Sequence, residues 1–246
     1  MNYQMIFQRY EKKYIISADQ KESLMEAIGG RLASDEYGSY TIANLYYDTE
    51  RFELARGTGR KQAYKEKLRM RSYGKAGDGK PVFLELKKKF RGVVYKRRSR
   101  LELDEAASFF SGNARNAVPS DQILREIRRF IDIRQKLEAR VFLAYDRTAY
   151  SGVDDPGLRV TFDTGIRFRR NDLRLDRESW GKEIMDPGKV LMEIKTPAAI
   201  PLWLCCALSE RGIFPVSFSK YGRCCADFLC IAKENGCNEW REYASA

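Results

Sequence analysis

The chain has 246 residues, enough to bury a sizeable core without disulfides or structural metals, which excludes a fibre or a disordered chain. It carries 45 Lys and Arg against 34 Asp and Glu, so its formal charge of +11 directs the search for a partner to anions. It contains no histidine, which excludes imidazole metal sites and every histidine-dependent catalytic triad.

The positive charge is concentrated in one segment. Residues 60–100 hold 16 basic side chains against three acidic ones, a net charge of +13, so the other 205 residues sum to −2. The six cysteines match neither a C-x-x-C redox motif nor zinc-ligand spacing, and we expect them to be small buried hydrophobic residues. No signal-like or membrane-spanning apolar run is present, so we expect a cytoplasmic chain without a membrane segment of its own.

Period-two patterns rich in Tyr, Phe, Val and Ile predict eight strands in a single domain. Between them, helix-start and helix-stop signals predict a helix from Ser17 to Gly29, one after Ser120, one from Pro201 to near Gly212 and one from Ser219 to about Asn235. The predicted strands are Phe7–Ile16, Thr41–Asp48, Tyr64–Tyr73, Val82–Lys88, Val93–Leu103, Ala139–Tyr150, Leu158–Phe168 and Val190–Lys195.

One face of several predicted strands carries charge. In residues 64–73 Lys67, Arg69 and Arg71 alternate with Leu68 and Met70, and residues 7–16, 82–88 and 93–103 show the same division. On one strand such a face is usually solvated, but like charges on adjacent strands repel each other unless an anion lies among them. We therefore expect the sheet to curl with its charged face inward, lining a tunnel wide enough for one small ligand.

The loop at residues 74–81 resembles a phosphate-binding P-loop only superficially. It reads G-x-x-x-x-G-K but ends in Pro81, where a P-loop needs Ser or Thr to hold Mg²⁺, and it joins two predicted strands. A hairpin turn is the better interpretation.

Nine charged and aromatic strings stand in the order expected for one known family. They are Arg9–Tyr14, Asn44–Thr49, Lys67–Tyr73, Phe83–Lys88, Lys96–Arg98, Arg147–Tyr150, Leu158–Asp163, Val190–Lys195 and Ser217–Tyr221. On these strings the chain resembles a bacterial VTC domain, the catalytic module of polyphosphate polymerases within the triphosphate tunnel metalloenzymes. The resemblance implies an α+β fold: an eight-stranded antiparallel tunnel with a basic interior, flanked by helices.

The resemblance also implies roles for individual residues and a divalent metal, Mn²⁺ or Mg²⁺. Glu193 corresponds to the metal-binding glutamate, with Glu11 and Glu85 as further candidates. The residues expected to act on the transferring phosphoryl group are Arg69, Arg71, Lys87, Arg159 and Lys220. Those expected to bind substrate are Arg9, Lys13, Lys67, Lys96, Arg98, Arg147 and Lys195.

One departure from the wider superfamily bears on the reaction. Its opening frame E-x-E-x-K here reads Arg9-x-Glu11-x-Lys13, so an arginine replaces the first metal-binding carboxylate. Losing a metal ligand disfavours hydrolysis by a metal-activated water, whereas a phosphate acceptor is already ionised and needs no base. We expect Arg9 to favour transfer over hydrolysis.

The sequence therefore predicts transfer of the γ-phosphoryl group of ATP onto a growing polyphosphate chain. Two alternatives remain: a tripolyphosphatase or nucleoside triphosphatase using the same tunnel, and a non-enzymatic module that binds nucleic acid or another polyanion. The expected ligands are ATP and polyphosphate or triphosphate, with nucleic acid disfavoured. The sequence does not identify the acceptor or a membrane partner protein.

Overall fold

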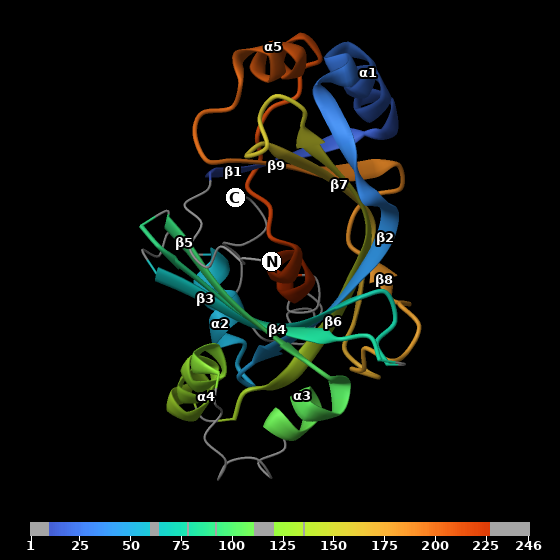
Figure 1. Ribbon diagram of the computed structural model, residues 1–246. Helices are drawn as coiled ribbons and strands as arrows, with labels where there is room; N and C mark the ends of the chain where they lie inside the picture. Colours follow the sequence, from blue (N-terminus) through green and yellow to red (C-terminus); the bar gives the residue numbers. More distant parts are fainter. Residues whose placement is uncertain are drawn as a thin grey trace.

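One antiparallel sheet organises the chain (Figure 1). The computed structural model describes residues 10–59, 64–77, 79–91, 93–110, 121–134 and 136–226. The strand order is β1-β9-β7-β6-β2-β3-β4-β5, and β8 pairs with β7 beside this path. The strands are β1 (Tyr10–Ser17), β2 (Leu32–Asp48), β3 (Tyr64–Tyr73), β4 (Val82–Phe90), β5 (Val93–Leu101), β6 (Glu138–Gly152), β7 (Arg159–Arg169), β8 (Lys182–Glu183) and β9 (Lys189–Thr196).

The sheet curves so that its two halves face each other. We call β1, β9 and β7 the upper wall and β3, β4 and β5 the lower wall; the long strands β2 and β6 join them (Figure 1). An ion pair crosses between the walls, from Lys87 Nζ to Glu11 Oε2 over 3.6 Å. The predicted eight-stranded antiparallel arrangement is confirmed, but no pairing joins β1 to β5 in the described residues, so the sheet is curved rather than a closed barrel.

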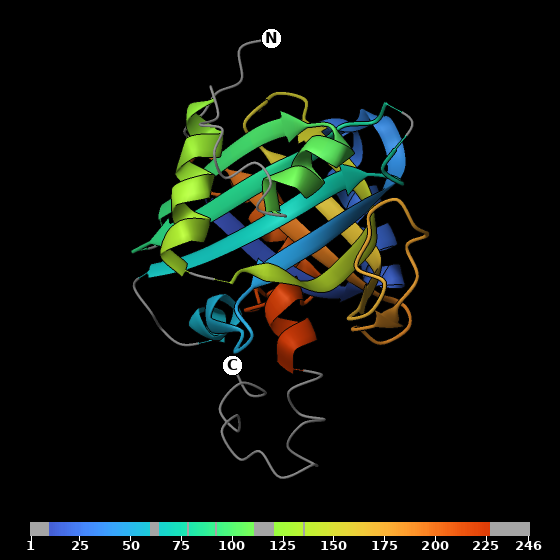
Figure 2. The ribbon, with the colours of Figure 1, turned by 90° about the horizontal axis from the view of Figure 1, so that it is seen from below.

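Helices cover the outer side of both walls (Figures 1 and 2). Leu24 of α1 and Leu204 of α5 pack against apolar side chains of the upper wall, and Phe109 of α3 and Ile127 of α4 pack against those of the lower wall. The helices thereby remove the apolar side chains on the outward faces of the strands from water. This burial is the main contribution to the stability of the fold. The helices are α1 (Ala18–Ile28), the 3-10 turn η1 (Gly29–Arg31), α2 (Glu53–Gly59), α3 (Leu103–Phe110), α4 (Gln122–Arg134) and α5 (Leu202–Glu210).

The start and end of α1 follow its local sequence. The Ser17 hydroxyl accepts a hydrogen bond from the Gln20 backbone N–H over 3.1 Å, and the Gln20 side chain accepts one from the Ser17 N–H over 3.1 Å. This is the predicted capping box. The helix ends at Gly29, whose φ of 51° is one that glycine adopts without strain.

A further helix lies between the two walls. It begins at residue 220 and is described through residue 226, and Ser219 caps it by accepting a hydrogen bond from the Gly222 N–H over 3.1 Å. Tyr221 stacks on Tyr46 of β2 with 4.3 Å between ring centroids and donates to Asp48 Oδ2 over 2.7 Å. Figure 2 shows this helix at the end of the sheet near α2. The predicted start at Ser219 is confirmed; the predicted end near Asn235 lies outside the described residues.

Several predicted boundaries need correction. The strand predicted to run to Leu103 ends at Leu101, because α3 begins at Leu103, and neither α2 nor α3 was predicted. The strand predicted from Thr41 starts at Leu32, ahead of a register shift between Ser34 and Ser39 that its polar sequence does not reveal. The beginning of the strand predicted from Phe7 and the helix cap at Ser120 lie outside the described residues.

Burial of the cysteines was predicted correctly only in part. Cys224 and Cys225 are buried, Cys205 is half-buried and Cys206 is exposed on α5, while Cys230 and Cys237 lie outside the described residues. Among the described residues, no helix combines the length and the apolar character that crossing a bilayer requires.

Candidate active site on the inner face of the sheet

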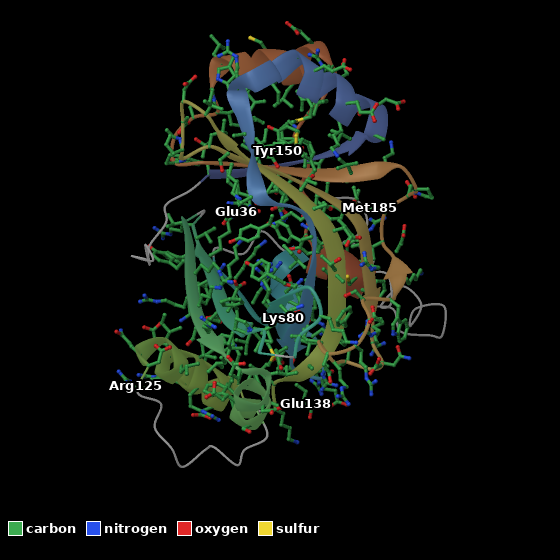
Figure 3. All side chains as sticks on the ribbon, turned by 45° about the vertical axis from the view of Figure 1, so that its right-hand side comes forward. Glu36, Lys80, Arg125, Glu138, Tyr150 and Met185 are labelled. Atoms are coloured by element: carbon green, nitrogen blue, oxygen red, sulfur yellow. The ribbon has the colours of Figure 1, made fainter. Side chains whose placement is uncertain are left out.

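The inner face carries the charged set of each strand. Because alternate side chains point to opposite faces, Leu68 and Met70 of β3 pack outward in the lower core while Lys67, Arg69 and Arg71 point inward. Figure 3 shows side chains from both walls projecting into the space between them, many ending in nitrogen. The hairpin joining β3 to β4 closes with a bridge between Gly77 and Lys80, as expected for a turn rather than a P-loop.

Glu85 of β4 holds four cations together on the lower wall. Its carboxylate lies 2.7 Å from Arg69, 2.7 Å from Lys96, 3.5 Å from Arg98 and 4.0 Å from Arg71, and its side chain is 1% exposed. Burial opposes ionisation, but Arg71, Arg69 and Lys96 outweigh it and hold the pKa of Glu85 well below its usual range. One carboxylate among four cations leaves this cluster with a positive charge that a bound anion would neutralise.

A second charged cluster lies on the upper wall around Glu193. Its two carboxylate oxygens each contact a lysine at 2.9 Å, Lys220 from the final helix and Lys195 from β9. Lys13 and Arg147 approach the same carboxylate to 3.5 and 3.7 Å. Burial disfavours the ionised form, but these four cations hold the pKa of Glu193 well below its usual range.

Asp163 of β7 joins the upper cluster and was not predicted. It accepts two hydrogen bonds from Arg147, over 2.6 and 2.7 Å, and its Oδ2 lies 2.5 Å from Lys220 Nζ. This two-point geometry fixes the guanidinium in orientation as well as position. A signal for it was present in the sequence. Asp163 follows Thr161 by two residues and Arg159 by four, and alternate residues of a strand share one face.

Neutral side chains orient the two central arginines. Arg71 donates to Asn44 Oδ1 over 3.0 Å and to the Tyr145 hydroxyl over 3.2 Å. Arg69 donates to the Tyr46 hydroxyl over 3.0 Å. Asn44 and Tyr145 were not predicted to have a role, although each lies on the inner face beside Arg71.

Glu11 links β1 to the lower wall. It lies 3.4 Å from Lys13 and 3.6 Å from Lys87. Burial works against its charge, but Lys87, Lys195 and Lys13 together lower the pKa of Glu11 to about 2 despite the nearby Glu193. Glu11 is therefore a carboxylate at every physiological pH.

The remaining predicted residues lie at the two ends of this face. Lys67 donates to Ser219 Oγ over 2.9 Å, and Arg159 contacts Asp35 over 3.3 Å. Arg9 lies outside the described residues, so its role stays a prediction. The eleven other predicted basic residues lie among five carboxylates: Lys13, Lys67, Arg69, Arg71, Lys87, Lys96, Arg98, Arg147, Arg159, Lys195 and Lys220, with Glu11, Asp35, Glu85, Asp163 and Glu193.

Anion binding at this face should take up protons near pH 8. Burial, reinforced by Lys87 and Lys13, lowers the pKa of Lys67 to about 7; burial, only partly offset by Glu85, lowers that of Lys96 to about 8. A bound triphosphate restores both charges, so calorimetry in buffers of different ionisation enthalpy should register uptake of about one proton at pH 8. Lys67→Gln should remove most of that uptake; a wild-type signal independent of buffer would contradict the assignment.

The same two lysines set how stability of the free protein depends on pH. The unfolded chain, with lysine pKa values near 10.5, binds protons that the folded state has released above about pH 7. Stability therefore rises with pH between about 7 and 10 through these two groups, and bound anion reduces that rise.

Comparison with known proteins places this geometry in a family. The VTC domain model matches residues 8–229. An adenylate cyclase candidate from Bacillus halodurans shares the fold with a TM-score of 0.54 and 16% identity over 87% of this chain and 95% of its own. An adenylyl cyclase candidate from Hippeastrum, described as having a dominant triphosphatase activity, shares it with a TM-score of 0.50 and 18% identity over 87% and 93%. No curated protein matches the sequence. The chain belongs to the VTC domain family.

Proposed function

We propose that the protein transfers the γ-phosphoryl group of ATP onto the end of a polyphosphate chain. The observation that carries this proposal is the imbalance on the inner face, where these eleven cations meet five carboxylates, Asp35 included, in the described residues. Arg71, Arg147 and Lys220 are each less than a tenth exposed, so their charges act at low dielectric. Such an array fits a ligand with several closely spaced negative charges.

The residues around Glu193 fit a divalent cation of the Mn²⁺ or Mg²⁺ type. Glu193 and Asp163 both contact Lys220, so the two carboxylates lie close together, and Thr161 stands opposite Glu193 in the strand register. The Thr161 hydroxyl is fully buried with no hydrogen-bond partner among the described residues. Mg²⁺ usually takes one or two carboxylates and completes its shell with waters and phosphate oxygens. When bound, such an ion would neutralise charge on the transferring phosphates.

The chemistry needs no general base from the protein. A terminal oxygen of the polyphosphate chain attacks the γ-phosphorus, the bond to the β–γ bridging oxygen breaks, and ADP leaves. The attacking oxygen is already ionised at neutral pH, so catalysis consists of positioning and charge stabilisation. Arg69 and Arg71, held by Tyr46 and Asn44, are oriented in advance to hold phosphate oxygens.

The arrangement disfavours the nucleic-acid alternative. Duplex DNA needs cations on an exposed surface, whereas the central cations here lie between two walls and pair with buried carboxylates such as Glu85 and Asp163. Hydrolysis, in which water is the acceptor, would use the same residues to hold the triphosphate. The polymerase and the triphosphatase are therefore distinguished by their products and not by this part of the site.

Incubation with ATP and Mn²⁺ tests the proposal. The γ-phosphate should appear mainly in long phosphate chains on a gel, and Arg71→Gln should lower the rate about 10- to 100-fold, since a buried charged hydrogen bond contributes roughly 1.5–3 kcal/mol. Arg97→Gln is the matched control, because Arg97 lies on the outer face of β5 and pairs with Glu126 of α4. Release of nearly all γ-phosphate to water would identify a triphosphatase instead.

A further inference from the structure

Four aromatic rings form a continuous series across β2, β3 and β4. Tyr37 meets Tyr40 with 6.2 Å between ring centroids, Tyr40 meets Tyr73 at 6.1 Å, and Tyr73 meets Phe83 at 5.6 Å. The first and last of these contacts are edge-to-face, with interplanar angles of 79°. We call these four residues the aromatic rim.

The aromatic rim belongs to the inner face. Tyr73 shares its side of β3 with Arg71, and Phe83 shares its side of β4 with Glu85, because side chains two residues apart point the same way. Tyr40 lies opposite Arg147 in the register of β2 and β6. The rim is thus continuous with the cations proposed to hold phosphate.

Two residues of the rim are exposed where other inner-face aromatic residues are not, while Tyr40 and Phe83 are half-buried. Tyr37 is 70% exposed and Tyr73 40% exposed, while Tyr46 and Tyr145 on the same face are 5% and 2% exposed. The exposed rings therefore do not serve as core, and their faces are accessible to a planar ligand.

Guanidinium groups border the rim on both sides. Arg98 stacks on Phe83 with 3.6 Å from its central carbon to the ring centroid, and it donates to the Tyr73 hydroxyl over 3.2 Å. Asp35, whose carboxylate accepts from the Tyr37 N–H over 3.3 Å, also pairs with Arg159. At the Phe83 end a ligand on the rim would therefore have the Arg98 guanidinium directly beside it, while at the Tyr37 end the charge of Arg159 is paired with Asp35.

A ligand that uses both features needs a flat unsaturated ring and an attached polyanion. Inorganic polyphosphate offers only the second. We propose that the aromatic rim binds the nucleobase of a nucleoside triphosphate whose phosphates lie on the inner-face cations. This rests on the proposed function and extends it to the base. Stacking on aromatic faces accepts any base, so the rim should favour purines for their larger ring without distinguishing adenine from guanine.

Calorimetric titration of each variant with ATP and with tripolyphosphate, both in EDTA, tests this inference. Tyr37→Ala should weaken ATP binding about 5- to 100-fold while tripolyphosphate binding stays within about twofold, since only ATP carries a base. Tyr73→Leu also removes the hydroxyl to which Arg98 donates, so it should weaken ATP binding more than it weakens tripolyphosphate binding. Tyr95→Ala is the matched control, being 48% exposed on the outward side of β5. It should change neither affinity.

A triphosphate of the fluorescent base 2-aminopurine gives an independent readout. Stacking quenches its emission, so binding to the wild type should quench it and binding to Tyr37→Ala should quench it less. Equal losses for ATP and tripolyphosphate, or unchanged ATP binding in both rim variants, would overturn the base site and leave the phosphate site intact. A wild type that binds neither ligand would overturn the proposed function, and this inference with it.

Discussion

Glu193→Gln should lower metal-dependent turnover about a thousandfold while leaving anion binding intact. The substitution keeps the shape of the side chain but removes the negative charge that Lys195 and Lys220 contact at 2.9 Å. A catalytic metal contributes several kcal/mol of charge stabilisation, and ~4 kcal/mol corresponds to a factor of about a thousand. Because the carboxylate competes with phosphate for the same lysines, tripolyphosphate in EDTA should bind the variant at least as tightly as the wild type.

The control for this prediction is a buried carboxylate on the other side of the sheet. Glu66 of β3 is 7% exposed and pairs with Arg134 of α4 outside the inner face. Glu66→Gln should lower stability without changing turnover per folded molecule. If Glu193→Gln instead kept full turnover, the metal ligand would have to be sought at Glu11 or Glu85.

Lys220→Met should destabilise the protein by about 3–5 kcal/mol at pH 7. The amine lies 2.5 Å from Asp163 and 2.9 Å from Glu193, and removing this buried partner leaves Asp163 with Arg147 alone and takes one of its two closest cations from Glu193. Methionine preserves most of the volume, so the loss reports charge rather than a cavity. Urea unfolding of both proteins at pH 7 measures it.

The pH dependence of this loss distinguishes charge from packing. In the wild type burial raises the pKa of Asp163, but Lys220 and Arg147 outweigh burial and depress that pKa, so the group contributes stability above the ordinary carboxyl pKa and loses it as the pH falls. Without Lys220 that pKa is higher, so the difference between wild type and variant should shrink as pH falls from 7 toward 4. Lys13→Met removes ion pairs of 3.4 and 3.5 Å and a hydrogen bond to the Phe218 carbonyl but no close contact to a fully buried carboxylate, and it should cost less. A loss independent of pH would assign Lys220 a packing role.

The alternation of side chains between the two faces of a strand explains why so much of the inner face could be predicted. Lys67, Arg69 and Arg71 alternate with apolar residues, and alternation fixes which side chains share a face without any knowledge of the fold. The same alternation along β7 places Asp163, four residues after Arg159, on the inner face. Asp163 was not predicted because a single acidic residue within an otherwise mixed strand has no pattern of its own.

Long-range contacts account for what the sequence could not show. The final helix was predicted from its cap at Ser219, but nothing local indicates that its next residue, Lys220, reaches strands β7 and β9. Likewise α2 and α3 are only seven and eight residues long, too short for their periodicity to be recognised.

The position of the final helix has a consequence for the order of folding. Lys220 and Tyr221 follow all nine strands in the chain, yet they pair with carboxylates of β2, β7 and β9. During synthesis Asp48, Asp163 and Glu193 therefore emerge before these two partners, and the contacts of Lys220 and Tyr221 form last. Such distant pairings carry a large loop-closure entropy and slow the final step. The sheet should consequently pass through an intermediate that already has its strands but lacks the contacts of Lys220 and Tyr221.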